Sequence, residues 1–393
     1  MIPRLSRAHR YTLAGFLYSV AVVIGAPVTV ASENCSTRAL VGLQEKAGAA
    51  FSVKAPALSI SIKEQAKAPV SWKIVDTALI ADPAATPLFH IGSITKTFTA
   101  ALVLLLDQEQ QLSINEPVSR WINLPNAASV TVAMLLEHTS GIPDILDLPG
   151  HAAQDSPENS LGHIAKANLL FSPGSRWDYS NSNYLLLGLI IERVTSRSYG
   201  QVLSERLLEP LGLTNTYLWG TEDRPSVLPG FRLACGGPEE DKCQDDKNYP
   251  VHRVNNGRDW RVAWSAGGLV SNSADLSEWM QALTQGPVLD EAHRNLLMTP
   301  TALSVQGLTD KGRFEGLRWR SMGMGLMQFV FEDESEAWGH SGYIDGFSAI
   351  AASAEGLPSV AITAALQQSN VYELAASSFS ELDCWTGSDK LVF

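Results

Sequence analysis

The sequence has few positive charges. Its 29 Lys and Arg face 41 Asp and Glu, which gives a formal net charge of −12 at pH 7. Nucleic-acid-binding proteins present a basic surface to phosphate groups, so this balance argues against a nucleic-acid partner. With 45% hydrophobic and 18% charged residues the composition is that of a globular protein, and 393 residues suffice for one large domain or two ordinary ones.

The sequence also lacks an apolar run of the roughly 18 residues that a membrane-spanning helix needs. A shorter run, Leu13 to Ala26, follows three arginines and precedes the small residues Ala31 and Ser32. This layout is typical of a secretory signal peptide, so we expect residues 1–32 to be removed and the mature protein to be periplasmic or secreted. The alternative is an uncleaved N-terminal anchor. In the mature chain we expect no stable membrane span.

Cysteine is scarce, with four residues in the chain. In an exported protein they are expected to be oxidised, and four cysteines allow three pairings. Cys235 and Cys243 flank a short polar loop, CGGPEEDKC, which favours a bond between them. That pairing leaves Cys35 with Cys384, which would join the two ends of the mature chain. Free buried thiols are the alternative.

Histidine is also scarce, and none of the eight is spaced for a zinc site. No two histidines stand four apart on a helix, and there is no His-Glu-x-x-His run. A zinc hydrolase is therefore not supported, and we expect neither a metal nor another cofactor. His90 and His138 are interpreted as packing or capping groups.

Strand and helix patterns follow a definite order along the chain. Short segments that alternate apolar and polar residues lie in the first and last thirds, and the middle third is mainly helical. Strands are predicted over 57–63, 71–80, 322–331, 346–352 and 359–364, and helices over 35–51, from 93 onwards, and over 131–138, 184–194, 199–208, 273–283 and 372–382. Strands at both ends around a helical middle predict an α/β (α+β) fold with one sheet built from both chain ends.

This order also predicts the domain organisation. A discontinuous α/β sheet domain would comprise residues 33–92 and 255–393, with a mostly helical domain, residues 93–254, inserted into it. The helix that begins near Ser93 is apolar nearly all round from Phe98 to Leu106. We therefore expect it to lie buried in the centre of the molecule.

Ser93 and Lys96 form the first candidate catalytic motif, in HIGSITKTFTAALVLLL. It is the one place in the sequence where a Ser precedes a Lys by three residues. On a helix this spacing puts both side chains on one face. A hydroxyl needs a base to become a nucleophile, and a neutral lysine beside it can be that base.

Tyr179 and Asn181 form the second motif, in PGSRWDYSNSNY. Pro173 and Gly174 place it in a loop ahead of a helix, where functional side chains are often presented. A phenol is a poor base at pH 7, but adjacent ammonium charge favours the phenolate. Asn offers both a donor and an acceptor for orienting an amide substrate.

The third motif is His340-Ser341-Gly342, in WGHSGYIDGF, just ahead of the strand predicted over 346–352. A structural tight turn that enters an edge strand is the alternative. Gly342 lets a substrate approach the backbone closely, and the next amide, on Tyr343, can donate a hydrogen bond. Taken singly, each of the three motifs is more often structural. Their combination, in this order, carries the functional interpretation.

Together the three motifs resemble the penicillin-recognising serine hydrolases, which are the serine β-lactamases, the DD-peptidases and their esterase relatives. The segments LLEHTSGIPD (Leu135 to Asp144), EPLGLTNT (Glu209 to Thr216) and SAGGLVSNSADLSEWM (Ser265 to Met280) resemble the framework of the class C β-lactamase and DD-carboxypeptidase branch. The resemblance covers nearly the whole mature chain. It implies a central antiparallel sheet flanked by helices.

The resemblance also implies a role for each motif residue. Ser93 would be the acylated nucleophile, with Lys96 and Tyr179 sharing the protons and Tyr179 passing one to the leaving group. Which of the two is the base stays open, because strongly coupled groups titrate as a pair. Asn181 would hold the substrate amide. The backbone N–H groups of Ser93 and Tyr343 would form the oxyanion hole.

One position departs from the β-lactamase pattern. Where class C β-lactamases carry Lys-Thr-Gly, this chain has His340-Ser341-Gly342. A lysine is a fixed cation that attracts a substrate carboxylate, whereas a histidine at pH 7 is mostly neutral. The motif resembles the His-containing variants of DD-carboxypeptidases, D-amino-acid peptidases and some esterases. Ser341 can still bind a carboxylate through its hydroxyl.

The predicted function is that of an exported serine hydrolase acting through an acyl-enzyme on Ser93. The preferred substrate is a peptide ending in D-alanyl-D-alanine or a related D-amino-acid compound. The alternatives are a β-lactamase or broad-specificity carboxylesterase with the same residues and, in a different class, a non-catalytic binding or sensor protein. The expected partner is a small-molecule or peptide substrate (cell-wall peptide, β-lactam or ester), and the oligomeric state stays open.

Overall fold

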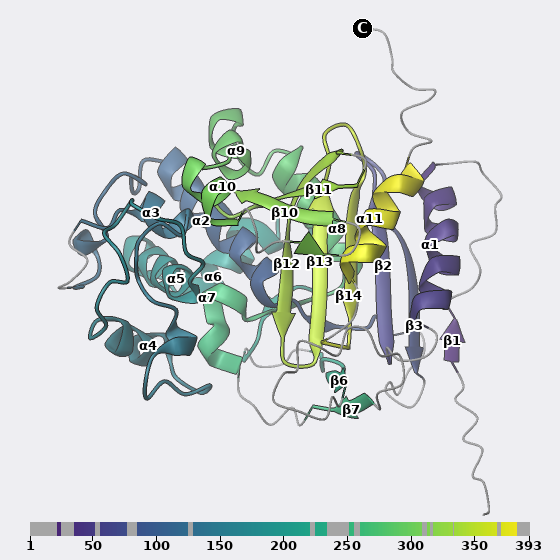
Figure 1. Ribbon diagram of the computed structural model, residues 1–393, viewed down its shortest axis with the longest axis horizontal. Coiled ribbons are helices and arrows are strands. Elements are labelled where there is room, and N and C mark those ends of the chain that lie inside the picture. Colours follow the sequence, from purple (N-terminus) through teal and green to yellow (C-terminus); the bar gives the residue numbers. More distant parts are fainter. Residues whose placement is uncertain are drawn as a thin grey trace, which may run out of the picture.

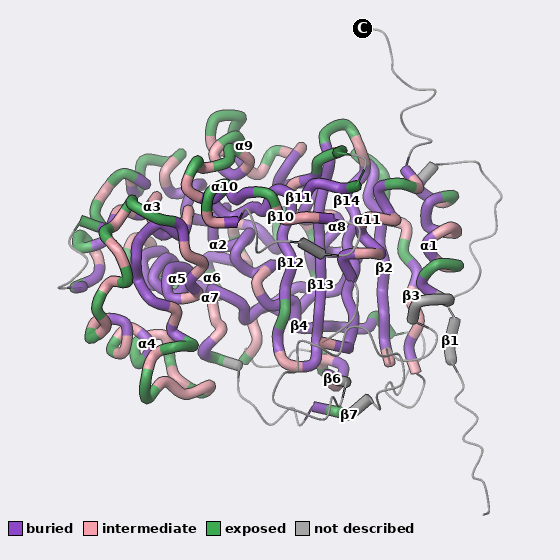
Figure 2. Tube along the Cα trace, viewed as in Figure 1, coloured by how far each residue is buried: buried purple, intermediate pink, exposed green. Residues whose placement is uncertain are grey.

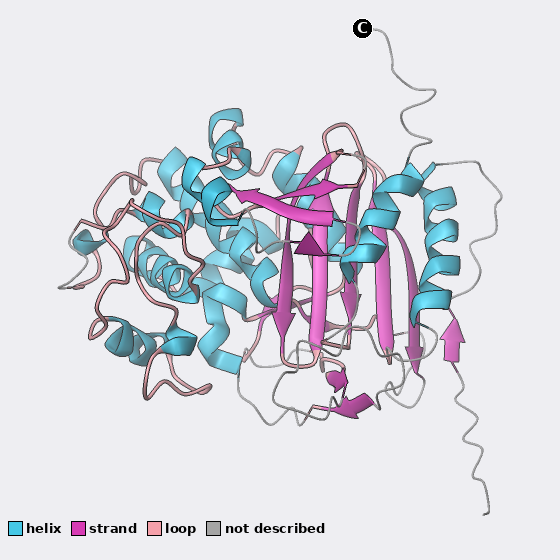
Figure 3. Ribbon diagram, viewed as in Figure 1, coloured by secondary structure: helices cyan, strands magenta, loops and turns pink. Residues whose placement is uncertain are grey.

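A computed structural model of the chain (Figure 1) describes residues 22–24, 35–51, 56–76, 85–124, 129–220, 225–233, 251–254, 260–308, 313–314, 317–332, 334–367 and 371–382. These residues form a sheet with helices on both faces and a helical region beside it, as the cyan and magenta elements of Figure 3 show. The mixed α/β fold predicted from the sequence is confirmed.

The sheet is antiparallel at every described pairing and is assembled from both ends of the chain. Its strand order is β1-β3-β2-β14-β13-β12-β11-β10-β9. The strands are β1 (Val22–Ile24), β2 (Ala57–Lys63), β3 (Val70–Asp76), β9 (Arg313–Phe314), β10 (Leu317–Met322), β11 (Met327–Phe331), β12 (Glu336–Ile344), β13 (Phe347–Ser353) and β14 (Ser359–Ala364). Ile60 on β2 lies opposite Ile362 on β14, so the first and last thirds of the chain meet inside the sheet.

Both faces of the sheet are covered by helices. One face carries α1 (Cys35–Phe51) and α11 (Val371–Glu381), and the other carries α8 (Ser273–Thr284). On β13, Ile350 packs in the core under α1 and α11, whereas its neighbour Ala351 belongs to the core that includes α8. Successive side chains on a strand point to opposite faces, so a strand covered on both sides is buried along its length. β2, β11, β13 and β14 are accordingly buried along their whole length.

The helical region is built around two long buried helices, α2 (Thr95–Gln108) and α5 (Asn181–Thr195), which Figure 2 draws largely in purple. Around them lie α3 (Val132–Leu136), α4 (Pro157–Ile164), α6 (Tyr199–Leu203), α7 (Trp264–Gly267), α9 (Glu291–Met298) and α10 (Ala302–Leu308). Short strands β4 (Phe89–His90), β8 (Leu269–Ser271) and β5 (Tyr217–Leu218) form a second sheet, and β6 (Phe231–Leu233) pairs with β7 (Val251–Arg253). The central, buried position predicted for the helix after Ser93 is confirmed.

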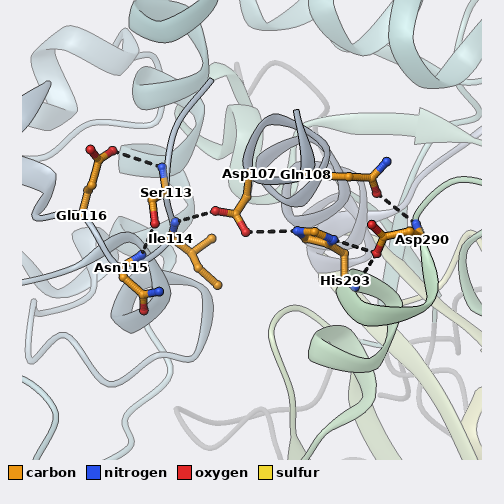
Figure 4. Close-up of polar contacts among 8 residues, drawn as sticks. All are labelled: Asp107, Gln108, Ser113, Ile114, Asn115, Glu116, Asp290 and His293. Atoms are coloured by element: carbon orange, nitrogen blue, oxygen red, sulfur yellow. Dashed lines mark hydrogen bonds and ion pairs between the residues drawn. The ribbon is translucent and has the colours of Figure 1, made fainter. Parts of the chain in front are cut away.

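A polar contact joins the C-terminal end of α2 to α9 (Figure 4). The His293 ring lies between two carboxylates, with Nδ1 2.7 Å from Asp290 Oδ1 and Nε2 3.1 Å from Asp107 Oδ2. Asp290 also caps α9, since its carboxylate accepts from the His293 backbone N–H at 2.8 Å. This contact holds α9 to the central helix although the two are far apart in sequence.

Most predicted elements are found close to their expected bounds. The helix over 35–51 and the strands over 57–63 and 359–364 agree with the structure at both ends. The helix predicted from 184 begins earlier, at Asn181, because the turn that carries the tyrosine motif leads straight into it. The strand expected over 71–80 is β3, whose last four expected residues lie outside the described part.

Two strand predictions are wrong. Residues 322–331 form the end of β10, a turn and β11, because Gly323 and Gly325 (φ +114°) reverse the chain. The motif His340-Ser341-Gly342, expected outside the strands and just ahead of one, lies within a strand of its own, β12. The glycines of this segment weaken its strand pattern, but pairing with β11 and β13 on either side supplies the order.

The N-terminal and cysteine predictions reach the limits of the described part. β1 lies within the segment predicted as a signal peptide and pairs with β3 at the edge of the sheet. The cysteine side chains lie outside the described residues, so both disulfides stay predictions. None of the described helices is long and apolar enough to cross a membrane. The division into two domains also stays a prediction.

Candidate active site

Ser93 lies on a single 3-10 turn, η1 (Gly92–Ile94), immediately before α2. The preceding Gly92 has φ +49°, and a Cβ atom there would lie 2.7 Å from the carbonyl oxygen of Tyr343. Glycine is the residue that adopts this backbone conformation without strain. It therefore allows the serine turn to pack directly against β12.

Lys96 lies in the first turn of α2 and is completely buried. Its Nζ atom donates to Ser93 Oγ at 3.0 Å, to Asn181 Oδ1 at 2.7 Å and to the carbonyl oxygen of Ala266 at 2.7 Å. Burial lowers the pKa of Lys96 to about 7, against an opposing effect of the Asp144 carboxylate. The amine next to the serine is therefore neutral in a substantial part of the molecules at neutral pH.

Tyr179 reaches the same point from the loop ahead of α5, and its hydroxyl is hydrogen-bonded to Ser93. The Lys96 Nζ atom lies 5.0 Å from the centre of its ring. Enclosure of the hydroxyl raises the pKa of Tyr179 above its ordinary value, although the bond to Ser93 opposes this rise. The expectation that nearby ammonium charge would favour the phenolate is therefore wrong, because desolvation is the larger effect.

Asn181 is the first residue of α5 and is held by Asp144, a residue that the sequence motifs did not single out. The Asp144 carboxylate accepts from the backbone N–H of Asn181 at 3.0 Å and from its Nδ2 at 2.8 Å. It also accepts from the backbone N–H of Leu146 at 2.9 Å. An acidic residue is stabilised at a helix N-terminus. Asp144 is the last residue of the LLEHTSGIPD segment, and that position was the one sequence feature that could have marked it as a site residue.

The motif on β12 divides into buried and exposed parts. His340 is completely buried, its Nδ1 lies 2.5 Å from the Ser341 carbonyl oxygen, and its ring centre is 6.5 Å from that of Tyr179. Burial, and then the charge of Lys96, lowers the pKa of His340 to about 3. The His340 imidazole is therefore neutral and shielded from solvent. Of the four predicted positions 340–343 on β12, Tyr343 alone is exposed, by 44%.

Gly342 is required by the close approach of β12 to the serine turn. A Cβ atom at this position would lie 1.9 Å from the carbonyl oxygen of Ile91 and 3.2 Å from the backbone nitrogen of Ser93. No other residue type fits without a shift of the turn. The approach brings the backbones of Ser93 and Tyr343 together at one point of the site.

A cleft of about 250 Å³ opens at Ser93. Its described lining is mainly apolar, and polar groups come from Asn181, Tyr343, Gln367 and the serine itself. The apolar side chains that line it are Ile145, Leu146, Val262, Ala263, Ala266 and Ile344. Leu146 is 57% exposed, so the cleft presents apolar surface at its mouth as well as inside.

The other two histidines singled out from the sequence are buried. His90 packs its ring against Trp219 at 4.8 Å and Phe347 at 5.3 Å, and burial lowers its pKa to about 4. His138 lies two residues beyond the last residue of α3, and its ring stacks on that of Tyr179. No group of acidic, histidine or cysteine side chains suited to a metal ion occurs among the residues that the structure describes.

The fold, and the meeting of Lys96 and Tyr179 at Ser93, which itself lines the cleft, are typical of the penicillin-recognising serine hydrolases. The chain matches the beta-lactamase family over residues 83–373, and it belongs to that family. It is 30% identical over 245 residues to the protein flp of Staphylococcus aureus strain N315. The matched region covers 58% of this chain and 45% of that protein. The chain thus spans about half the length of the curated relatives it matches.

Two solved structures show how far the fold is shared. A D-stereospecific amidohydrolase from Streptomyces sp. superposes with a TM-score of 0.67 at 26% identity, covering 86% of this chain and 97% of the other. The D-amino acid amidase from Ochrobactrum anthropi SV3 superposes with a TM-score of 0.73 at 23% identity, covering 89% of this chain and all of the other, 100%. The second likeness establishes the fold alone.

Proposed function

We propose that the chain is an exported serine acyl hydrolase that opens an amide or ester through an acyl-enzyme on Ser93. The observation that carries this proposal is the bond of 3.0 Å between Ser93 Oγ and the buried amine of Lys96, whose pKa is about 7. A lysine with its ordinary pKa would be charged and could not take the proton of the serine. Burial turns it into a base suited to neutral pH.

In the first half-reaction, Ser93 Oγ attacks the substrate carbonyl carbon and its proton passes to the neutral amine of Lys96. The oxyanion that forms is stabilised by the backbone N–H groups of Ser93 and Tyr343. When the intermediate collapses, the bond to the leaving group breaks and the Tyr179 hydroxyl protonates that group. The proton held by Lys96 then passes to Tyr179 and restores its phenol form, so both groups are back in their starting states in the acyl-enzyme.

In the second half-reaction, water attacks the acyl-enzyme ester. The pair formed by Lys96 and Tyr179 takes the proton from this water, and Ser93 leaves and regains its own proton. Of the two, Lys96 fits the role of base in the free enzyme, because its pKa is lowered to about 7 whereas the pKa of Tyr179 is raised. Asn181 lines the cleft. One N–H of its side-chain amide donates to Asp144, and the second N–H can bind the substrate carbonyl.

The proposed substrate is a peptide or amide of a D-amino acid, with D-alanyl-D-alanine peptides as the first candidate. The likeness to the Streptomyces D-stereospecific amidohydrolase supports this class. The apolar lining of the cleft supports an uncharged side chain on the acyl part of the substrate. A β-lactamase or a broad-specificity carboxylesterase would use the same residues and is the alternative. A non-catalytic binding or sensor protein is the second alternative.

A substrate panel on purified mature protein tests the substrate class. Hydrolysis of a D-Ala-D-Ala peptide, a D-amino-acid amide and its L-enantiomer is compared with that of a penicillin and a short p-nitrophenyl ester. We expect faster turnover of the D-peptide or D-amide than of the L-amide. Negligible peptide and amide rates beside fast ester or penicillin turnover would contradict the proposal and favour the alternative.

Covalent labelling tests whether the protein is an enzyme at all. The protein is incubated with an active-site phosphonate and its intact mass is measured, with Ser93→Ala as the matched control. We expect one adduct on the natural chain and none on Ser93→Ala. A natural chain that gains no mass would favour the binding or sensor role.

Export and the disulfides are part of the same proposal. Removal of residues 1–32 would give a mature N-terminus next to Cys35, and α1, which begins there, packs against α11, which ends three residues before Cys384. This arrangement supports the pair Cys35–Cys384, with Cys235–Cys243 as the second bond. Peptide mapping of secreted protein under non-reducing conditions tests both, and any other pairing would contradict them.

A further inference from the structure

One buried histidine, His138, holds both backbone neighbours of Tyr179. Its carbonyl oxygen accepts from the backbone N–H of Asp178 at 2.9 Å, and its ring Nδ1 accepts from the backbone N–H of Ser180 at 3.1 Å. The imidazole also stacks on the Tyr179 ring, with centres 4.4 Å apart and planes inclined by 24°. His138 thus binds the residue before Tyr179, binds the residue after it and packs on one face of the tyrosine ring.

The protonation state of the ring is set by its partners. A backbone N–H can only donate, so Nδ1 of His138 carries the lone pair and the ring proton lies on Nε2. A second donor, Nδ2 of Asn183, lies 3.3 Å from the same Nδ1 atom. Burial is the main cause that keeps the pKa of His138 well below 6.5, and the nearby amine of Lys96 adds to this effect. The ring therefore stays neutral and remains an acceptor at neutral pH.

The backbone at this position also departs from the ordinary. His138 has φ +57° at the C-terminal end of α3, a left-handed conformation that non-glycine residues adopt infrequently. The conformation turns its carbonyl oxygen and its ring toward the same loop. Helix termination and the fixing of residues 178–180 are therefore achieved by the same residue.

We infer that His138 is a positioning residue for acylation, which holds the Tyr179 hydroxyl at Ser93 through the acceptor at Nδ1. The inference rests on the proposed function, because it assigns Tyr179 a part in proton transfer. His138 does not line the cleft, so it acts on the reaction through the tyrosine. Loss of its acceptor would release Ser180 and let the hydroxyl move away from the serine.

Three substitutions separate the acceptor from the ring. His138→Asn keeps an acceptor near the position of Nδ1 but removes the stack, His138→Phe keeps the stack but removes the acceptor, and His138→Gly removes both. Asn and Gly adopt the left-handed conformation readily, so these two variants preserve the end of α3. Thermal unfolding of each variant reports whether the fold is retained.

The rate at which an active-site phosphonate labels Ser93, measured by intact mass, is the readout together with kcat and KM on the best substrate of the panel. A displacement of a catalytic group by about 1 Å lowers rates by about 10²-fold, so we expect this fall in His138→Gly with KM little changed. His138→Phe should fall similarly, whereas His138→Asn should stay within about tenfold of the natural chain. Imidazole added to His138→Gly should restore the labelling rate, because it can refill the cavity and supply the acceptor.

The outcomes distinguish this inference from the proposed function. If the natural chain is not labelled, the proposed function fails. If the natural chain is labelled but His138→Gly is labelled equally fast, only the positioning role is overturned. A His138→Phe variant that is faster than His138→Asn would also overturn it, since the stack and not the acceptor would then matter. Imidazole that restored thermal stability without the labelling rate would reduce His138 to a structural group.

Discussion

Replacing Asp144 with asparagine should shift the pH at which the protein becomes active. The Asp144 carboxylate opposes the lowering of the Lys96 pKa, and the asparagine side chain has the same shape without the charge. The ammonium form of Lys96 would lose this stabilisation, so its pKa would fall below about 7. In the proposed mechanism the neutral amine is the active form, so the acidic limb of the pH–rate profile should move to lower pH.

The size of the shift follows from the geometry. One amide group, that of Asn181, separates the two charges, with hydrogen bonds of 2.7 Å to Lys96 Nζ and 2.8 Å to Asp144 Oδ2. Two unit charges about 8 Å apart interact by about 2 kcal/mol at an effective dielectric constant of about 20, which corresponds to about 1.5 pK units. Asp144 is only half-buried, and solvent screening reduces this value. We expect a shift of about one pH unit.

The assay is the second-order rate of labelling of Ser93 by a phosphonate, or kcat/KM, measured across the neutral pH range. Asp147→Asn is the matched control, because Asp147 lies in the same turn, η3 (Ile145–Asp147), is exposed and undergoes the same change of charge. Asp144→Asn also loses its bond to the Leu146 backbone N–H, which lowers the plateau but not the midpoint. A midpoint that stays in place or rises would refute the argument.

Three further variants test other parts of the structure. Gly342→Ala would place a methyl group 1.9 Å from the carbonyl oxygen of Ile91, so kcat should fall by about 10²-fold; retention of full activity would contradict the close approach of β12. Tyr179→Phe should slow amide turnover by about 10²-fold or more but affect p-nitrophenyl esters less, because that leaving group needs no proton; equal losses on both would contradict its role as acid. Asp290→Asn keeps the cap of α9 but loses the charge next to His293, whose backbone N–H and ring lower the pKa of Asp290. The natural chain should therefore have the higher Tm above pH 3.8, and the difference should vanish as the pH falls through the lowered pKa; a difference that persists in acid would contradict this.

Elements whose residue pattern is local could be predicted from the sequence, whereas elements ordered by contacts with distant segments could not. The strand over 57–63 was predicted at both ends because its alternation of small polar and branched apolar residues is local. β12 was missed because Gly339 and Gly342 have low strand propensity, and its order comes from pairing on both sides. Gly342, one of the two glycines that weaken the strand pattern, is also the residue that the close approach of the serine turn requires.

The same division applies to the site. Ser93, Lys96 and Tyr179 were found because their chemistry and short spacings can be read along the chain. Asp144 was missed as a site residue because its contact with Asn181 joins positions 37 apart in sequence. The use of His138 as an acceptor for the Ser180 N–H depends in the same way on a contact across 42 positions.

The amino-acid sequence alone indicated the candidate reacting groups, the family and the order of helices and strands, because local periodicity and short motifs carry that information. The protonation of the candidate groups could be inferred from the folded molecule alone. Burial lowers the pKa of Lys96 and His340 and raises that of Tyr179, and burial is a property of the packed molecule, since it depends on which distant segments exclude water from each group.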